Sequence, residues 1–212
     1  MENILFLHGW GGNENSFAPI LPFLKTKYRC ICVGMPREPD TPWTLEDYVK
    51  LVFEELDRLG IDKTHIVAHS FGARVTALLV TQQPERFDKL LLAGPAGIKP
   101  RFSLWRWFKI RLHKWKIIKG KGSEDYRVLS QNGKITFQNI IKRDLVPEIS
   151  QIKHQTLIIW GTKDKAIKKY MVKRWTKLNQ YTTLKKYENA GHFCYLDEPT
   201  RFIVDIEEFL NV

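Results

Sequence analysis

The chain has 212 residues, of which 43% are hydrophobic, with 34 Lys and Arg against 23 Asp and Glu, for a formal net charge of +11. This length suits one domain of ordinary size, and no apolar run approaches the roughly 20 residues that cross a bilayer. Neither a basic leader nor a cleavage site accompanies the first apolar run at 4–7, so we expect no export signal of the usual form. The three cysteines, Cys30, Cys32 and Cys194, lack metal-ligand spacing. We therefore expect reduced thiols and a cytoplasmic protein.

The first predicted strand, 4–7, runs into His8-Gly9-Trp10-Gly11-Gly12. A glycine-rich loop after a buried strand is also typical of an ordinary strand-to-helix turn. Such a loop can, however, turn a backbone N–H toward a neighbouring nucleophile. The N–H of Trp10 is therefore one candidate donor for an oxyanion hole.

The next elements alternate between strand and helix. Strands are predicted at 30–33, 65–68 and 89–93, and helices at 44–59 and 72–83, which is the pattern of βαβ units in a mainly parallel sheet. Thr44 and Asp47 have the spacing of a helix N-cap pair, and Gly60 has the position of a C-cap glycine.

The strand at 65–68 leads into Ala68-His69-Ser70-Phe71-Gly72 and then a helix. Small residues two positions before and after the serine let strand and helix approach closely, and the tight turn presents the Ser70 hydroxyl as a nucleophile. The alternative is a serine that only N-caps the helix. As a nucleophile, Ser70 would have the N–H of Phe71 as its second oxyanion donor.

The alternation stops between 94 and 155, and we predict one domain over 1–212 with a short helical lid inserted at 98–150. Nine Lys and Arg and no acidic residue lie in 98–122, so the remaining 25 basic and 23 acidic residues nearly balance. Read as a helix, 104–118 is amphipathic: Trp105, Trp107 and Phe108 would line the substrate pocket, opposite a basic stripe. The stripe is either a solvated face or a docking site for an acidic carrier protein or an anionic membrane surface. No nucleic-acid motif accompanies it, so no nucleic-acid partner is expected.

Two further strands, 156–160 and 183–187, each precede a candidate site residue. Asp164 follows the first of them and His192 follows the second, while helices are predicted at 167–178 and 198–210. Open parallel sheets carry their sites at the carboxyl ends of the strands. Ser70, Asp164 and His192 therefore form a candidate catalytic triad.

The motifs HGWGG, AHSFG, WGTKD and AGHF, in this order, resemble those of serine hydrolases of the α/β-hydrolase superfamily. Within it the chain resembles the carboxylesterase group that includes pimeloyl-acyl-carrier-protein methyl ester esterases. This resemblance implies an α/β-hydrolase fold of about six strands in the order 2-1-3-4-5-6. It also implies cleavage of a small acyl ester or thioester through an acyl-enzyme on Ser70, with no metal or organic cofactor. The alternatives are a C–C bond hydrolase or a perhydrolase of the same fold, or a ligand-binding homologue with little turnover.

Overall fold

The computed structural model of the protein describes residues 1–99 and 128–211. The predicted lid helix at 104–118, with Trp105, Trp107, Phe108 and nearly all of the basic stripe, lies outside these residues. Within the described ranges, no helix combines the length and apolar character that crossing a membrane requires. Cytoplasmic localisation stays a prediction.

The centre of the molecule is a six-stranded sheet in which every neighbouring pair is parallel. The strands are β1 (Glu2–Leu7), β2 (Tyr28–Val33), β3 (Thr64–His69), β4 (Phe87–Ala93), β5 (Thr156–Gly161) and β6 (Thr182–Tyr187). Their order, β2-β1-β3-β4-β5-β6, confirms the predicted α/β-hydrolase fold. The register brings the strand ends together, with His69 opposite Ala93 and Gly161 opposite Tyr187.

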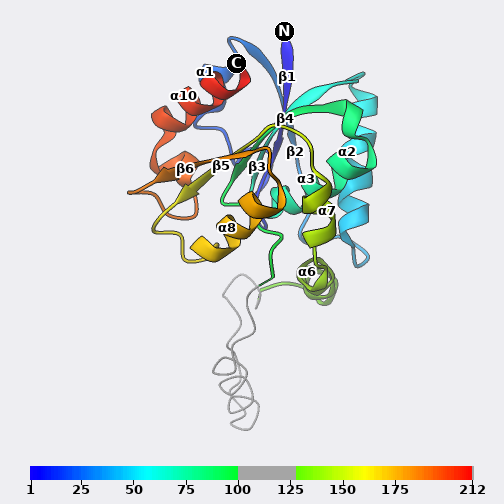
Figure 1. Ribbon diagram of the computed structural model, residues 1–212. Coiled ribbons are helices and arrows are strands. Elements are labelled where there is room, and N and C mark those ends of the chain that lie inside the picture. The colour runs from blue at the N-terminus through cyan, green and yellow to red at the C-terminus, as the bar shows by residue number, and fades with distance from the viewer. Residues whose placement is uncertain (100–127, 212) are drawn as a thin grey trace.

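Helices cover both faces of the sheet, and Figure 1 shows α1 and α10 on one side and α2, α3 and α7 on the other. The first face carries α1 (Leu21–Leu24), α9 (Cys194–Asp197) and α10 (Pro199–Leu210), and its core includes Phe17 and Phe202. The second carries α2 (Leu45–Arg58), α3 (Phe71–Gln82), α7 (Val146–Gln151) and α8 (Lys169–Leu178), around Tyr48 and Trp175. A short 3₁₀ turn, η1 (Pro84–Arg86), precedes β4.

The four predicted helices are confirmed, with ends that move by one or two residues. The cap of α2 is as expected, because the Thr44 N–H donates to the Asp47 carboxylate at 2.7 Å and Gly60 has φ +64 after its last turn. Sequence periodicity did not predict α1, α7, α9 or α6 (Gln131–Lys142). Helix α6 and most of α7 belong to the predicted insertion at 98–150.

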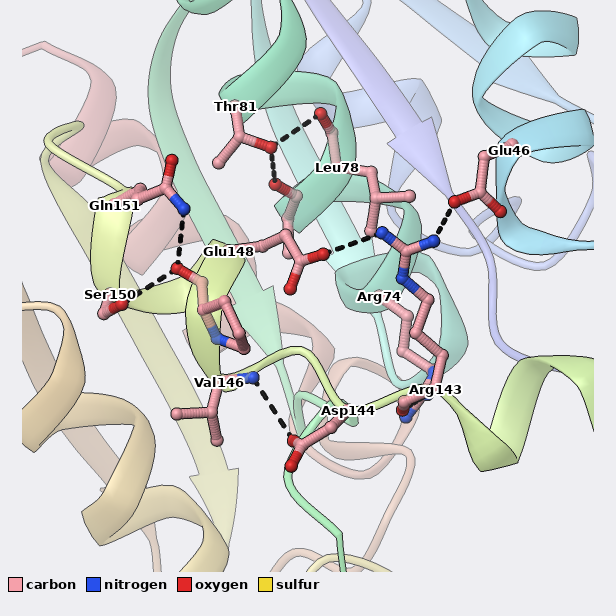
Figure 2. A network of polar contacts seen from close by, with 12 residues as sticks. Glu46, Arg74, Leu78, Thr81, Arg143, Asp144, Val146, Glu148, Ser150 and Gln151 are labelled. Carbon is pink, nitrogen blue, oxygen red and sulfur yellow. Dashed lines mark hydrogen bonds and ion pairs between the residues drawn. The ribbon is translucent and has the colours of Figure 1, made fainter.

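Buried and half-buried arginines anchor α6 to the rest of the fold. Arg74 of α3 donates to the carbonyls of Ile140 and Arg143, the latter at 2.8 Å, at the carboxyl end of α6. Burial lowers the pKa of Arg74 to about 10, so it stays charged at neutral pH. Arg143 in turn pairs with Glu46 of α2 and with Glu148 of α7, as Figure 2 shows. Three helices thus fix the position of α6, which lies beyond the carboxyl edge of the sheet (Figure 1).

Candidate active site

The structure brings Ser70, His192 and Asp164 into one chain of hydrogen bonds at the carboxyl edge of the sheet. The Ser70 Oγ lies 3.1 Å from His192 Nε2, and His192 Nδ1 lies 2.8 Å from Asp164 Oδ2. Because a carboxylate can only accept, Nδ1 carries the proton and Nε2 is free to accept one from the Ser70 hydroxyl. A serine in this arrangement can be deprotonated as it attacks a carbonyl carbon.

Ser70 sits on a sharp turn between β3 and α3. It is the one non-glycine residue with positive φ (48°) in the described part of the chain, a conformation that costs free energy and is held by its surroundings. The Ser70 N–H donates to the Ala93 carbonyl at 3.0 Å, and its carbonyl accepts from the Ala96 N–H at 3.1 Å. Gly72 permits the close approach of helix and strand, because a Cβ there would lie 2.2 Å from the Leu7 carbonyl oxygen.

Asp164 is held as an anion inside the protein. Its side chain is fully buried, and Oδ1 accepts the N–H groups of Ala166 at 2.7 Å and Ile167 at 2.9 Å. Burial by itself raises the pKa of this carboxyl, but the hydrogen bond from His192 and the two backbone bonds outweigh it and bring the pKa below its usual value. Asp164 therefore stays ionised at neutral pH and can orient the His192 ring.

The loops that carry Asp164 and His192 are bonded to each other. The Lys163 N–H donates to the Ala190 carbonyl at 3.0 Å, which joins the two loops. On the His192 side, the Gly191 N–H donates to the Asp197 carboxylate of α9 at 2.7 Å. Gly161 makes this approach possible, because a Cβ there would lie 2.2 Å from the Gly191 carbonyl oxygen. The relative position of acid and histidine is thus fixed by backbone contacts.

The assignment of the Trp10 and Phe71 N–H groups as oxyanion donors stays a prediction, and the backbone around each of them bears on it. The N–H of Phe71 is the first of α3, where a helix leaves its N–H groups without helical acceptors. The peptide that carries the Trp10 N–H is held through its carbonyl, that of Gly9, which accepts from the Gly12 N–H at 3.0 Å and from His8 Nδ1 at 2.8 Å. His8 is held in turn, because its Nε2 accepts the Met35 N–H at 2.8 Å. Because a trans peptide points its C=O and N–H in opposite directions, these bonds also set the direction of the Trp10 N–H.

The side chains of these two residues belong to an open run of five aromatic rings, which we name the aromatic circuit and define as Trp10, Phe71, Tyr48, Trp43 and Phe137. Its ring centroids are 5.6 Å apart for Trp10 and Phe71, 5.0 Å for Phe71 and Tyr48, 4.9 Å for Tyr48 and Trp43, and 5.3 Å for Trp10 and Phe137. Hydrogen bonds at 2.9 and 3.1 Å join the Trp43 backbone to side chains of α6, the helix that carries Phe137. The insertion helix is therefore in contact with the loop of the first oxyanion donor.

Other reactive side chains near Ser70 are held in inert forms. Burial raises the pKa of Cys194 to about 12, so this thiol stays protonated two residues after His192. His69 is buried and lies 3.0 Å, through Nε2, from the His192 carbonyl oxygen, which requires Nε2 to carry the proton. Burial, and then the nearby His192, lower the pKa of His69 to about 3. Among the described residues, no group of three or more His, Cys, Asp or Glu could hold a metal.

The neutral His69 predicts a loss of stability in acid. The unfolded chain binds a proton at this position below about pH 6.5, whereas the folded protein does so only near pH 3. The contribution of His69 to the free energy of unfolding is thus fully present above pH 6.5 and is lost as the pH falls toward 3. The loss amounts to about 3 kcal/mol at pH 4. Thermal unfolding of wild type and His69→Asn at pH 7 and pH 4 measures this effect. The asparagine variant should lose less stability between the two pH values, and equal losses would contradict the prediction.

A parallel sheet of this order with a Ser–His–Asp chain at its carboxyl edge defines an α/β hydrolase. The chain belongs to the alpha/beta hydrolase family, whose sequence profile matches residues 4–206. It is 23% identical to the uncharacterized hydrolase YugF of Bacillus subtilis, over 99% of this chain and 90% of that one. Among solved structures it is similar to an esterase of Exiguobacterium antarcticum (18% identity, 100% and 92% of the two chains, TM-score 0.81). It is also similar to the meta-cleavage product hydrolase of Pseudomonas fluorescens IP01 (19%, 100% and 91%, TM-score 0.78).

These likenesses show the family and the fold. The narrower resemblance to the carboxylesterase group with pimeloyl-acyl-carrier-protein methyl ester esterases stays a prediction, as do the lid boundaries at 98–150. The sequence missed two features of the site, the aromatic circuit and the half-buried Arg37 beside the glycine-rich loop. Arg37 follows the carboxyl end of β2, and that position at the sheet edge was the available signal.

Proposed function

We propose that the protein is a serine hydrolase that cleaves carboxylic esters or thioesters through an acyl-enzyme on Ser70. The observation that carries this proposal is the hydrogen-bonded chain of Ser70, His192 and Asp164, with the serine on a strained turn. The family membership supports an enzyme, and the likeness to an esterase supports the reaction class.

The reaction needs two proton transfers in each half. His192 Nε2 takes the Ser70 proton as Oγ attacks the carbonyl carbon, and the N–H groups of Trp10 and Phe71 stabilise the oxyanion. The imidazolium, paired with Asp164, then gives its proton to the departing alcohol or thiol. Water, deprotonated by His192, attacks the acyl-enzyme. The imidazolium then returns this proton to Ser70 Oγ as the bond to the acyl group breaks, which releases the acid and the free serine.

Trapping of the acyl-enzyme tests this proposal. With p-nitrophenyl butyrate, we expect release of p-nitrophenol and, after acid quench, a butyryl group on the peptide that contains Ser70. A fluorophosphonate should label the same serine and abolish the hydrolysis. Hydrolysis with no modification of Ser70 would contradict the mechanism, and an unreactive Ser70 would favour a ligand-binding homologue.

Cleavage of a C–C bond next to a ketone is the second candidate, favoured by the likeness to the meta-cleavage product hydrolase. Both reactions use the same serine, so the substrate distinguishes them. The comparison is between the kcat/KM for an unsaturated 1,5-diketone that carries a carboxylate and the kcat/KM for a simple ester, each measured separately. The proposal of an esterase requires a higher kcat/KM for the ester.

Docking of an acidic carrier protein or an anionic membrane surface concerns 98–122, nearly all of which lies outside the described residues. It stays a prediction and has no part in the mechanism above.

The aromatic circuit predicts that a residue of α6 affects the chemical step. Phe137→Ala removes the ring that packs on Trp10 at 5.3 Å, so the Trp10 N–H loses part of its support. Since loss of a whole oxyanion donor costs about 10²–10³ in kcat, we expect about a tenfold decrease from its misplacement, with KM little changed. Affinity for a trifluoromethyl ketone, which forms the same oxyanion, should fall in parallel, and Phe137→Tyr should restore both.

The matched control is Phe53→Ala, which breaks a different ring pair, Phe53 and Phe87 at 6.3 Å. This variant should keep kcat and inhibitor affinity even where it lowers stability. If Phe137→Ala loses stability as Phe53→Ala does but keeps its kcat, the circuit has no role in positioning Trp10.

A further inference from the structure

A cavity of about 240 Å³ lies between the glycine-rich loop after β1 and the loop of His192. Its wall includes Gly9, Trp10, Arg37, His69 and Phe193. These residues flank the reacting groups, since His69 precedes Ser70 in the chain and Phe193 follows His192. A Cβ on Gly9 would lie 3.5 Å from the Ser70 Cβ, which places this wall of the cavity beside the serine. The cavity can therefore hold one end of a substrate whose carbonyl Ser70 attacks.

Arg37 is the charged side chain of this wall, and it has no partner in the described part of the chain. Its guanidinium makes no hydrogen bond, ion pair or ring contact there. The neighbouring Glu38 directs its carboxylate to the backbone and hydroxyl of Ser130 instead. The guanidinium of the half-buried Arg37 therefore keeps its N–H groups available to an acceptor from outside the described part of the chain.

The other arginines make Arg37 an exception. Within the described ranges, each other arginine that is not exposed has an acceptor for its guanidinium, namely Arg74, Arg86 and Arg143. The arginines without partners there, Arg29 and Arg174, are exposed to solvent. Among the described arginines that are not fully exposed, Arg37 is the one whose guanidinium makes no hydrogen bond or ion pair, and it lies at the wall of a cavity beside the nucleophile.

The glycine-rich loop lets the guanidinium come close. Gly11 has φ +80, and a Cβ at this position would lie 3.6 Å from Arg37 Nη1. The positive charge therefore lies against the loop that carries the Trp10 N–H, where part of the surrounding water is replaced by protein. A planar guanidinium with free N–H groups in such a place suits a carboxylate or a phosphate, which it binds through two parallel hydrogen bonds.

We propose that Arg37 binds an anionic group of the substrate, a carboxylate or a phosphate, so that the ester cleaved at Ser70 is negatively charged. This inference rests on the proposed function and adds a substrate class to it. The cavity wall positions the uncharged part of the substrate, and Arg37 selects esters that carry the anion at the far end.

Paired p-nitrophenyl esters test the proposal. The hemiglutarate carries a carboxylate at the end of a five-carbon acyl chain, and the valerate ends in a methyl group. We expect the ratio of kcat/KM for hemiglutarate over valerate to fall about tenfold or more in Arg37→Gln, and less in Arg37→Lys. A second pair, the butyrates of 4-hydroxybenzoate and phenol, places the anion on the alcohol side. Inhibition of valerate hydrolysis by glutarate and by inorganic phosphate distinguishes a carboxylate site from a phosphate site.

The control is Arg29→Gln, which removes an exposed arginine on β2 that makes no contact with the cavity. It should leave both ratios unchanged. The proposal is overturned if Arg37→Gln leaves both ratios unchanged as well, or lowers the rates of charged and neutral esters equally.

Failure of the proposed function gives a different result. If the wild type hydrolyses no ester, titration calorimetry still measures the binding of glutarate and phosphate to the wild type and to Arg37→Gln. Binding that disappears in the variant supports an anion site in a protein that is not an esterase. Absence of binding to the wild type overturns the anion site itself.

Discussion

Ser70→Ala is expected to lower kcat for p-nitrophenyl butyrate by a factor on the order of 10⁶, while the protein stays folded. The alanine removes Oγ, the atom that lies 3.1 Å from His192 Nε2, and no other described nucleophile is ready to replace it. The thiol of Cys194, two residues after His192, is kept protonated by burial. Initial rates over a range of substrate concentrations measure the effect.

Stability separates this result from unfolding. The backbone bonds that hold the turn involve the N–H and C=O of residue 70, which alanine retains, so the midpoint of thermal unfolding should change little. Ser150→Ala, on the exposed side of α7, is the matched control and should keep full activity. Titration with a fluorophosphonate shows whether the Ser70→Ala sample contains any wild-type enzyme. If a sample with no titratable site keeps most of the activity, Ser70 has no role in the mechanism.

The strands of the fold could be predicted because each is a short apolar run that the sheet buries. In β3 and β5 every residue is buried, so the run in the sequence and the strand in the structure nearly coincide. The start of β2 was placed two residues late, because the exposed Arg29 interrupts the apolar run after Tyr28. Edge strands carry such polar residues, and sequence patterns locate their ends less well.

Helix α6 could not be predicted from its own sequence. It buries only Gly133, Thr136 and Ile140, which have helical spacing. Because only one of the three is a large apolar residue, the sequence shows little hydrophobic periodicity there. Its position depends on Arg74, 66 residues away from Ile140, and on Trp43, 93 residues away from Thr136. Contacts of this kind come from the tertiary structure, and so does the aromatic circuit.

The candidate triad could be predicted because its residues follow three strands whose ends must meet at one edge of a parallel sheet. The chain order Ser70, Asp164, His192 then selected one aspartate and one histidine among several. Arg37 also follows a strand, but a single arginine in a loop matches no motif. Its missing partner is visible only when the side chains around it are known.

Asp164→Asn is expected to lower kcat by about 10⁴, less than the loss in Ser70→Ala. The amide fits the same space, and its oxygen can still accept the N–H groups of Ala166 and Ile167. Its NH₂ group then faces His192 Nδ1, which must give up its proton to accept this bond. The proton moves to Nε2, so the imidazole can no longer take the proton of Ser70. Rates measured on a folded variant report this change of tautomer, and labelling of Ser70 by a fluorophosphonate should slow in parallel because it uses the same base.

The control is an aspartate of α9 that is bonded to the loop of His192. Asp197 accepts the Gly191 N–H at 2.7 Å and does not contact the His192 ring in the described structure, so Asp197→Asn should lower kcat far less than Asp164→Asn. The pKa of Asp164 in the wild type lies below the usual value of an aspartate. Its carboxylate therefore stays charged at a pH where an ordinary aspartate would begin to be protonated. A decrease in wild-type activity between neutral pH and pH 5 would therefore not come from protonation of Asp164. If Asp164→Asn keeps the wild-type kcat, a different residue orients His192.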